Sequence, residues 1–129
     1  MKLYRISFLF LLLFLFIPSL SFAQNAANKS WNPFWTQFKS AVKTKDKAVI
    51  RRAMSSESDF ITTGGIASRN DFMKMFNDKS YWKDLQESVD SGVKSYVSEN
   101  GRPARKTKNN YLIFQYIGGK WRFVGLMGD

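Results

Sequence analysis

The sequence of 129 residues lacks both cysteine and histidine. Without cysteine, the chain has no disulfide bonds, no thiolate nucleophile and no cysteine-linked lipid anchor. Without histidine it has no Ser-His-Asp or Cys-His catalytic group, and the two absences together exclude zinc and haem sites built on these residues. We therefore expect no metal and no cofactor, and a fold that is stabilised by its apolar core.

Acidic residues are also few, with 10 Asp and Glu against 20 Lys and Arg, so the formal net charge is +10. A basic balance of this kind attracts nucleic acid, anionic lipid or acidic polysaccharide. Nucleic acid is nevertheless not an expected partner, because the basic residues are spread along the chain. One dense cluster occurs in the segment 102–108, and it consists of Arg102, Arg105, Lys106 and Lys108. The favoured interpretation is a solvated strand that keeps the protein soluble, and the alternative is a surface that binds an anionic partner.

A single long apolar run is present, from Phe8 to Ile17, and Lys2 and Arg5 precede it. A positive start, a short apolar run and a small-residue end are typical of a secretory signal peptide. Ten apolar residues are too few to cross the roughly 30 Å of hydrocarbon in a bilayer. We therefore interpret 1–23 as a signal peptide rather than as an uncleaved membrane anchor.

The small residues Ser21 and Ala23 predict cleavage between Ala23 and Gln24. Cleavage there leaves a mature chain that is exported to a periplasm or secreted and that does not span a membrane. The segment 24–30 is polar and aperiodic, which predicts a short flexible lead. The remaining residues, 31–129, are enough for one domain but not for two.

The first part of this domain carries aromatic residues at helical spacing. They recur every four residues over Trp31–Lys43, which predicts an amphipathic helix with Pro33 in its first turn. A second helix is expected to start near Asp46, because an acidic residue is favourable at a helix N-terminus.

The middle of the chain carries one expected strand and two expected helices. Ser58–Thr63 is rich in β-branched and aromatic residues and precedes two glycines, which predicts a short strand and a turn. A capping box that begins at Ser68 predicts a third helix that extends to about Asn77. Ser80 is expected to cap a fourth helix.

From Gly92 onward the apolar residues alternate with a period of two, and Asn100-Gly101 is a strong signal for a hairpin. The expected strands cover 93–97, 102–108, 111–117 and 121–127. Helices followed by an antiparallel meander indicate the α+β class, with N-terminal helices packed on a curved antiparallel sheet of about four to five strands.

The segments Phe34–Asp46, Gly64–Phe76 and Tyr111–Leu126, taken with this order of elements, resemble the nuclear-transport-factor-2-like superfamily, which includes SnoaL-like and ketosteroid-isomerase-like proteins. The resemblance implies a cone-shaped, cystatin-like fold with an apolar pocket between helices and sheet. It also implies a homodimer through the sheet. Because the superfamily includes enzymes as well as binding proteins, the fold leaves the function open.

Aromatic residues are expected where the helices meet the sheet, most of them as core and some as the lining of an apolar pocket. Lys120 and Arg122 alternate with aromatic residues and are expected at the other face or at the rim. The leading hypothesis is a non-enzymatic binding module for a small apolar or amphiphilic ligand, or for a protein partner at the sheet face. The expected ligand-binding residues are Trp35, Phe60, Phe76, Phe114, Tyr116, Trp121 and Phe123.

An enzyme is the alternative hypothesis. An isomerase or dehydratase needs a carboxylate base in an apolar pocket and a donor for the oxyanion. Asp59 is the acid with apolar strand residues beside it, and Tyr116 or Tyr111 is the candidate donor. The favoured interpretation of Asp59 is an exposed acid in a loop.

Overall fold

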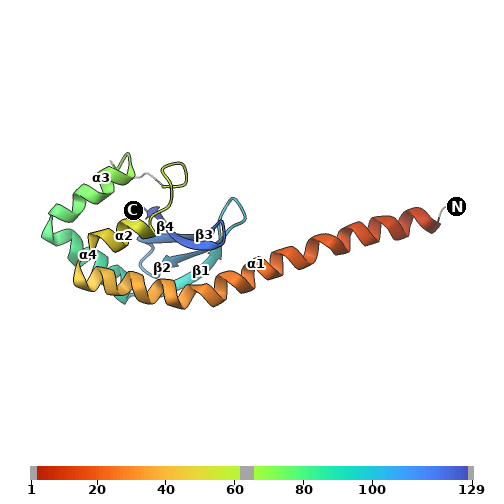
Figure 1. Cartoon of the computed structure of the whole chain (residues 1–129), viewed down its shortest axis with the longest axis horizontal. Coiled ribbons are helices and arrows are strands. Elements are labelled where there is room, and N and C mark those ends of the chain that lie inside the picture. The colour runs from red at the N-terminus through yellow and green to blue at the C-terminus, as the bar shows by residue number, and fades with distance from the viewer. Residues whose placement is uncertain (1–2, 62–65, 128–129) are drawn as a thin grey trace.

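The computed structural model describes residues 3–61 and 66–127, with side chains from Phe22 onward. It confirms the α+β class: helices pack against one four-stranded antiparallel sheet, which does not close (Figure 1). The elements in chain order are α1 (Leu3–Thr44), α2 (Lys47–Ala53), α3 (Arg69–Lys74), the 3₁₀ turn η1 (Met75–Asn77), α4 (Lys79–Asp90), β1 (Val93–Val97), β2 (Pro103–Thr107), β3 (Leu112–Ile117) and β4 (Lys120–Leu126).

Helix α1 is continuous over its whole length, and its N-terminal part stands away from the rest of the protein (Figure 1). The expected helix over Trp31–Lys43 is the C-terminal part of α1, but the helix does not begin there. Pro33 therefore lies inside a helix rather than in a first turn. Pro33 is exposed, and because a proline nitrogen has no hydrogen to donate, the helical hydrogen bond to the carbonyl oxygen of Lys29 is absent.

The segment 24–30, expected as a flexible lead, is helical and lies in α1. Ala27 is fully buried, and the indole Nε1 of Trp121 donates a hydrogen bond to its carbonyl oxygen over 2.7 Å. The polar composition of the segment did not indicate this contact, because a single small residue, Ala27, is enough to pack the segment against the sheet.

The turn between α1 and α2 has the hydrogen bonds of a Schellman motif, from Asp46 N to Ala41 O (2.8 Å) and from Lys45 N to Val42 O (3.2 Å). Lys45 takes the required left-handed conformation with φ 57°. Asp46 then caps α2 as expected, since its Oδ1 accepts a hydrogen bond from Val49 N over 3.2 Å. This turn brings α2 back against the end of α1.

Ser68 caps α3 as expected, because its Oγ accepts a hydrogen bond from Asp71 N over 3.1 Å at the start of the helix. The cap of α4 is wrong by two residues. Asp78, not Ser80, is the N-cap, and its Oδ1 accepts from both the backbone nitrogen and the hydroxyl of Ser80 at 2.9 and 2.8 Å. The carboxylate of Asp78 accepts both bonds at once. Ser80 is already inside the helix, so its hydroxyl is not in the N-cap position from which a side chain accepts bonds from the first backbone N–H groups.

The sheet is the expected meander, with strand order β1-β2-β3-β4 and every neighbouring pair antiparallel. Asn100-Gly101 lies in the β1–β2 turn, with Gly101 at φ 80°. A β-bulge interrupts the β3–β4 register between Ile113 and Phe114.

Within the described part of the expected strand over Ser58–Thr63, the pairing is an isolated bridge from Ile61 to Gly125, and a second isolated bridge joins Met54 to Phe123 before it. Between the bridges the chain turns, with Phe60 N bonded to Ser56 O over 3.0 Å. The last residues of this expected strand and its two glycines fall in 62–65, outside the described residues.

Gly125 of β4 is required by the close approach of this segment. A Cβ atom there would lie 2.6 Å from the backbone oxygen of Ile61, and φ is 140°. Only glycine tolerates both conditions. The segment 54–61 is thereby held along the edge of β4.

The core is aromatic and lies between the helices and one face of the sheet. Phe114 of β3 is fully buried at its centre, and its ring packs edge-on against Trp31, Trp35 and Phe38 of α1. Phe123 of β4 stands directly opposite Phe114 and contacts Phe72 of α3. We call this the inner face of the sheet.

Candidate functional site

The seven aromatic residues expected in a ligand pocket lie mainly in the core. Six are buried and belong to the aromatic core between helices and sheet. Tyr116 is half-buried, with its ring centre 5.6 Å from that of Trp121. Trp121 is the member of this set that lines a groove opening to the surface.

This groove has a volume of about 380 Å³ and lies between α1, α2 and the β3–β4 turn. We call it the α1–α2 groove. Its apolar wall consists of Phe34, Phe38, Val49, Ala53 and Trp121, and its polar and basic residues are Ser30, Gln37, Arg52, Lys120 and Arg122, with Pro33 and Gly119 completing the lining. The volume and the apolar wall are typical of a small-molecule site.

The groove forms because α2 is short and small side chains face α1. Val49 and Ala53 are half-buried against the core and too small to fill the angle between the two helices. A second hollow, of about 580 Å³, continues along α1 and shares Pro33, Gln37 and Val49 with the first.

Three basic side chains border the α1–α2 groove at its β4 end. Arg52 and Lys120 are exposed, and Arg122 is half-buried. The Nη1 of Arg122 donates to the carbonyl oxygen of Arg52 over 3.0 Å. This carbonyl lies in the last turn of α2, where a cation is favourable. The bond holds the guanidinium of Arg122 at the rim.

The second hollow differs in charge. Its lining includes no lysine or arginine, and it contains the carboxylate of Asp46. None of the residues that line the α1–α2 groove is acidic. The positive charge therefore gathers at one end of a longer depression along α1.

Asp59, the candidate base, is paired rather than free. Its Oδ1 lies 3.0 Å from the Nη1 of Arg102, and both side chains are about two-thirds buried, with exposed fractions of 29% and 33%. The hydrogen bond from Arg102 holds the pKa of the Asp59 carboxyl below its usual value. A base in an apolar pocket needs a raised pKa, so the geometry of Asp59 is that of a structural ion pair.

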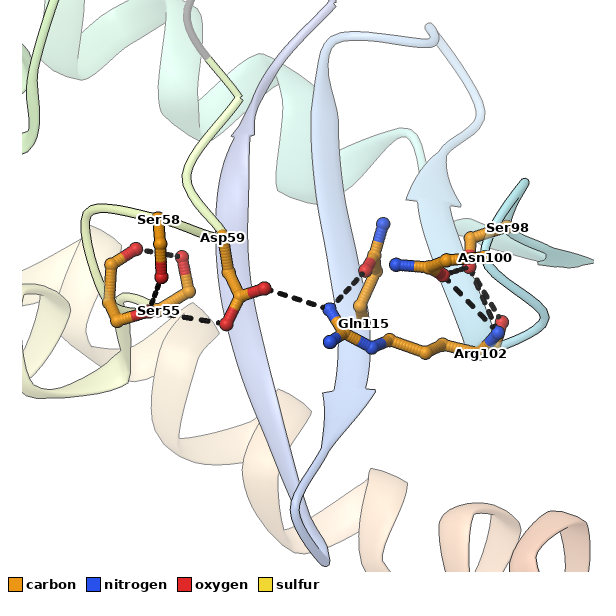
Figure 2. A network of polar contacts seen from close by, with 8 residues as sticks. Ser55, Ser58, Asp59, Ser98, Asn100, Arg102 and Gln115 are labelled. Carbon is orange, nitrogen blue, oxygen red and sulfur yellow. Dashed lines mark hydrogen bonds and ion pairs between the residues drawn. The ribbon is translucent and has the colours of Figure 1, made fainter.

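Figure 2 shows how this pair forms. Arg102 leaves the β1–β2 turn and extends across the sheet past Gln115 of β3, whose Oε1 is 3.5 Å from its Nη1, toward Asp59. The backbone nitrogen of Arg102 donates to the hydroxyl of Ser98 over 3.0 Å, which fixes the start of the side chain. We call this side of the sheet the outer face.

The candidate oxyanion donors are not beside Asp59. Tyr116 follows Gln115 in β3, so it lies on the inner face, while the pair of Asp59 and Arg102 lies on the outer face. Tyr111 interacts with Tyr81 of α4, and burial together with Tyr111 raises the pKa of the Tyr81 hydroxyl. The structure does not assemble the expected acid–base site.

The basic cluster over 102–108 does not form a single patch. Arg105 points to the inner face, where its guanidinium lies 4.7 Å from the ring centre of Trp31 and 5.7 Å from that of Trp121. Lys106 points the opposite way and lies over Tyr96 at 5.3 Å. Arg102 pairs with Asp59, and Lys108 is exposed. The four residues of the cluster therefore have different surroundings, and three of them already contact other side chains.

Neither a metal site nor a membrane span is found in the part of the chain that the structure describes. No group of three or more acidic side chains gathers there in a way that would hold a metal ion. No helix among those residues has an apolar stretch long enough to cross a membrane.

No protein-family model, curated protein or solved structure matches this chain. Sequence reasoning identified Trp121 and expected Lys120 and Arg122 at the other face or at the rim, but it missed Val49, Arg52 and Ala53. The periodicity of these residues indicates only which side of α2 is buried. It does not indicate the groove, because the groove depends on the angle between α1 and α2.

Proposed function

We propose that this protein is an exported, non-enzymatic binding module of the nuclear-transport-factor-2-like kind, which holds one small apolar or amphiphilic molecule in the α1–α2 groove. The observation that carries the proposal is an open groove of about 380 Å³ with an apolar wall on an otherwise filled aromatic core. Export is proposed from the signal-peptide pattern of 1–23, and a homodimer through the sheet stays a prediction from the resemblance.

Binding is favoured over catalysis by the surroundings of the candidate base. The ion pair between Asp59 and Arg102 stabilises the charged carboxylate, which makes it a weak proton acceptor. The groove lining contributes no carboxylate or tyrosine that would replace it. Apolar contact is what the groove offers, and burial of apolar surface supplies affinity at about 25 cal/mol per Å².

Two alanines of α2 provide a matched test. Ala53 lines the groove, whereas Ala48 is exposed on the same helix and lines neither hollow. Ala53→Phe fills the groove with its own ring and should lower the affinity for octan-1-ol at least tenfold. Ala48→Phe should leave the affinity unchanged.

The protein is purified from an exporting host and titrated with octan-1-ol, and binding is monitored by the backbone amide chemical shifts in NMR spectra. Native mass spectrometry of the same sample reports any ligand retained from the host. The proposal fails if neither octan-1-ol nor octanoate causes shifts at the groove, or if the two phenylalanine variants behave alike. The thermal midpoint of each variant shows whether it is folded.

A further inference from the structure

We infer that the occupant of the α1–α2 groove is a single-chain amphiphile with an anionic head group, bound with its head between Arg52, Lys120 and Arg122. This inference rests on the proposed function and adds the chemical class of the ligand. The shared chemistry is a short apolar chain that ends in a carboxylate, sulfonate or phosphate.

The charges around the depression set the direction of the ligand. The three basic residues border its β4 end, whereas the hollow along α1 has no basic residue in its lining and contains Asp46. An anion is therefore favoured at the first end over the second. The tail therefore lies against Phe34, Phe38 and Val49, and the head lies beside the β3–β4 turn.

Arg122 is the central contact for the head group. A guanidinium has five N–H donors in a fixed planar fork, and one of them is used by the carbonyl oxygen of Arg52. This bond orients the fork, so the remaining donors meet an anion at little further cost in side-chain entropy. Arg52 and Lys120 are exposed in the same lining and add charge without fixed geometry.

The absence of acids from the groove lining is what makes this charge available. Elsewhere Arg102 is paired with Asp59, and Arg105 lies against two tryptophan rings. The three basic residues of the groove line it without any carboxylate among them. Arg122 also borders a separate hollow that Asp59 lines. The lining of the α1–α2 groove itself contains no acid, and its positive rim beside an apolar wall complements an anionic amphiphile.

The test compares octanoate with octan-1-ol, below the concentration at which either forms micelles. A groove without charge recognition prefers the alcohol, because the carboxylate loses more hydration on binding. We expect octanoate to bind the purified protein about three- to tenfold more tightly, the sum of a few partly exposed ion pairs. Amide chemical shifts report both affinities at the same residues.

Neighbouring arginines supply the matched control. Arg52→Gln removes a charge at the rim, and Arg51→Gln removes one from the exposed adjacent position, which lines neither hollow. Arg52→Gln should weaken octanoate binding about two- to fivefold and leave octan-1-ol unchanged. Lys120→Gln should act in the same way, with Lys94→Gln as its exposed control on β1.

The results distinguish the proposed groove from the proposed anionic head group of its ligand. If octan-1-ol binds as well as octanoate, the anionic head group is wrong and the groove stands. If Arg51→Gln weakens octanoate as much as Arg52→Gln, the effect is net charge and the assignment is wrong. If neither probe binds, both proposals fail. Binding to phosphatidylglycerol vesicles without binding to octanoate also overturns the inference in favour of a lipid surface.

Discussion

The two faces of the sheet hold their neighbouring segments by different means, although each uses an arginine from the same region of the chain. On the inner face, Arg105 lies against Trp31 and Trp121 at the edge of an aromatic core. On the outer face, Arg102 spans the sheet to an ion pair with Asp59. Apolar burial is worth more than a partly exposed ion pair, so the inner face carries the stability and the outer face holds one segment in place.

The largest expected effect is at the centre of the inner face. Phe114→Ala removes a fully buried ring that contacts α1 and β4. We expect the free energy of unfolding to fall by about 3–5 kcal/mol, from lost burial and from the cavity that remains. Urea denaturation followed by circular dichroism measures the change. A loss below about 1 kcal/mol would contradict the assignment of this face as the stabilising one.

A smaller effect is expected from the inner-face arginine. Arg105→Ala removes the contacts with both tryptophan rings and a hydrogen bond from its Nη2 to the Oδ1 of Asn28 over 3.3 Å. The free energy of unfolding should fall by about 1–2 kcal/mol.

Arg105→Lys serves as the control, because it keeps the charge but loses the planar group that stacks. It should recover less than half of the lost stability in the same denaturation experiment. Full recovery by lysine would mean that charge alone matters at this position.

The smallest effect is expected on the outer face, and it depends on pH. The pKa of Asp59 is lowered by Arg102, so the ion pair stabilises the fold above the usual carboxyl pKa of about 3.9 and loses this contribution as the pH falls through its lower folded value. Asp59→Asn should therefore be less stable than the wild type at pH 7 and equal to it in strong acid.

Denaturation midpoints of the two proteins between pH 7 and pH 2 check this expectation. Arg102→Gln should behave like Asp59→Asn, and the double variant should lose no more than either single one. If Asp59→Asn stays less stable than the wild type at low pH, the contribution of Asp59 to stability does not come from the ion pair.

Much of the fold follows from local patterns. The aromatic spacing over Trp31–Lys43, the capping box at Ser68 and the Asn100-Gly101 turn all predict elements that the structure contains. These signals are readable because periodicity and capping depend on residues within one or two turns of each other. The cap of α4 was missed by two residues because Asp78 and Ser80 are both good capping residues and only the backbone conformation separates them.

The candidate site was harder to predict. The expected pocket residues lie between helices and sheet, where six of the seven are buried in the core. Whether facing aromatic rings leave a cavity depends on their packing, which the order of residues does not describe. Asp59 has apolar neighbours in the sequence, but its partner Arg102 is 43 positions away.

By itself, the sequence determined the α+β class, the order of the later helices and of the four meander strands, and the exclusion of chemistry based on cysteine or histidine. The tertiary structure alone decided three further features: the helical state of 24–30, the pairing of Asp59 and the presence of an open groove beside α2. The physical reason is range. Periodicity is a local property, whereas the bond from Trp121 to Ala27, the reach of Arg102 and the angle between α1 and α2 depend on residues that meet only after the chain has folded.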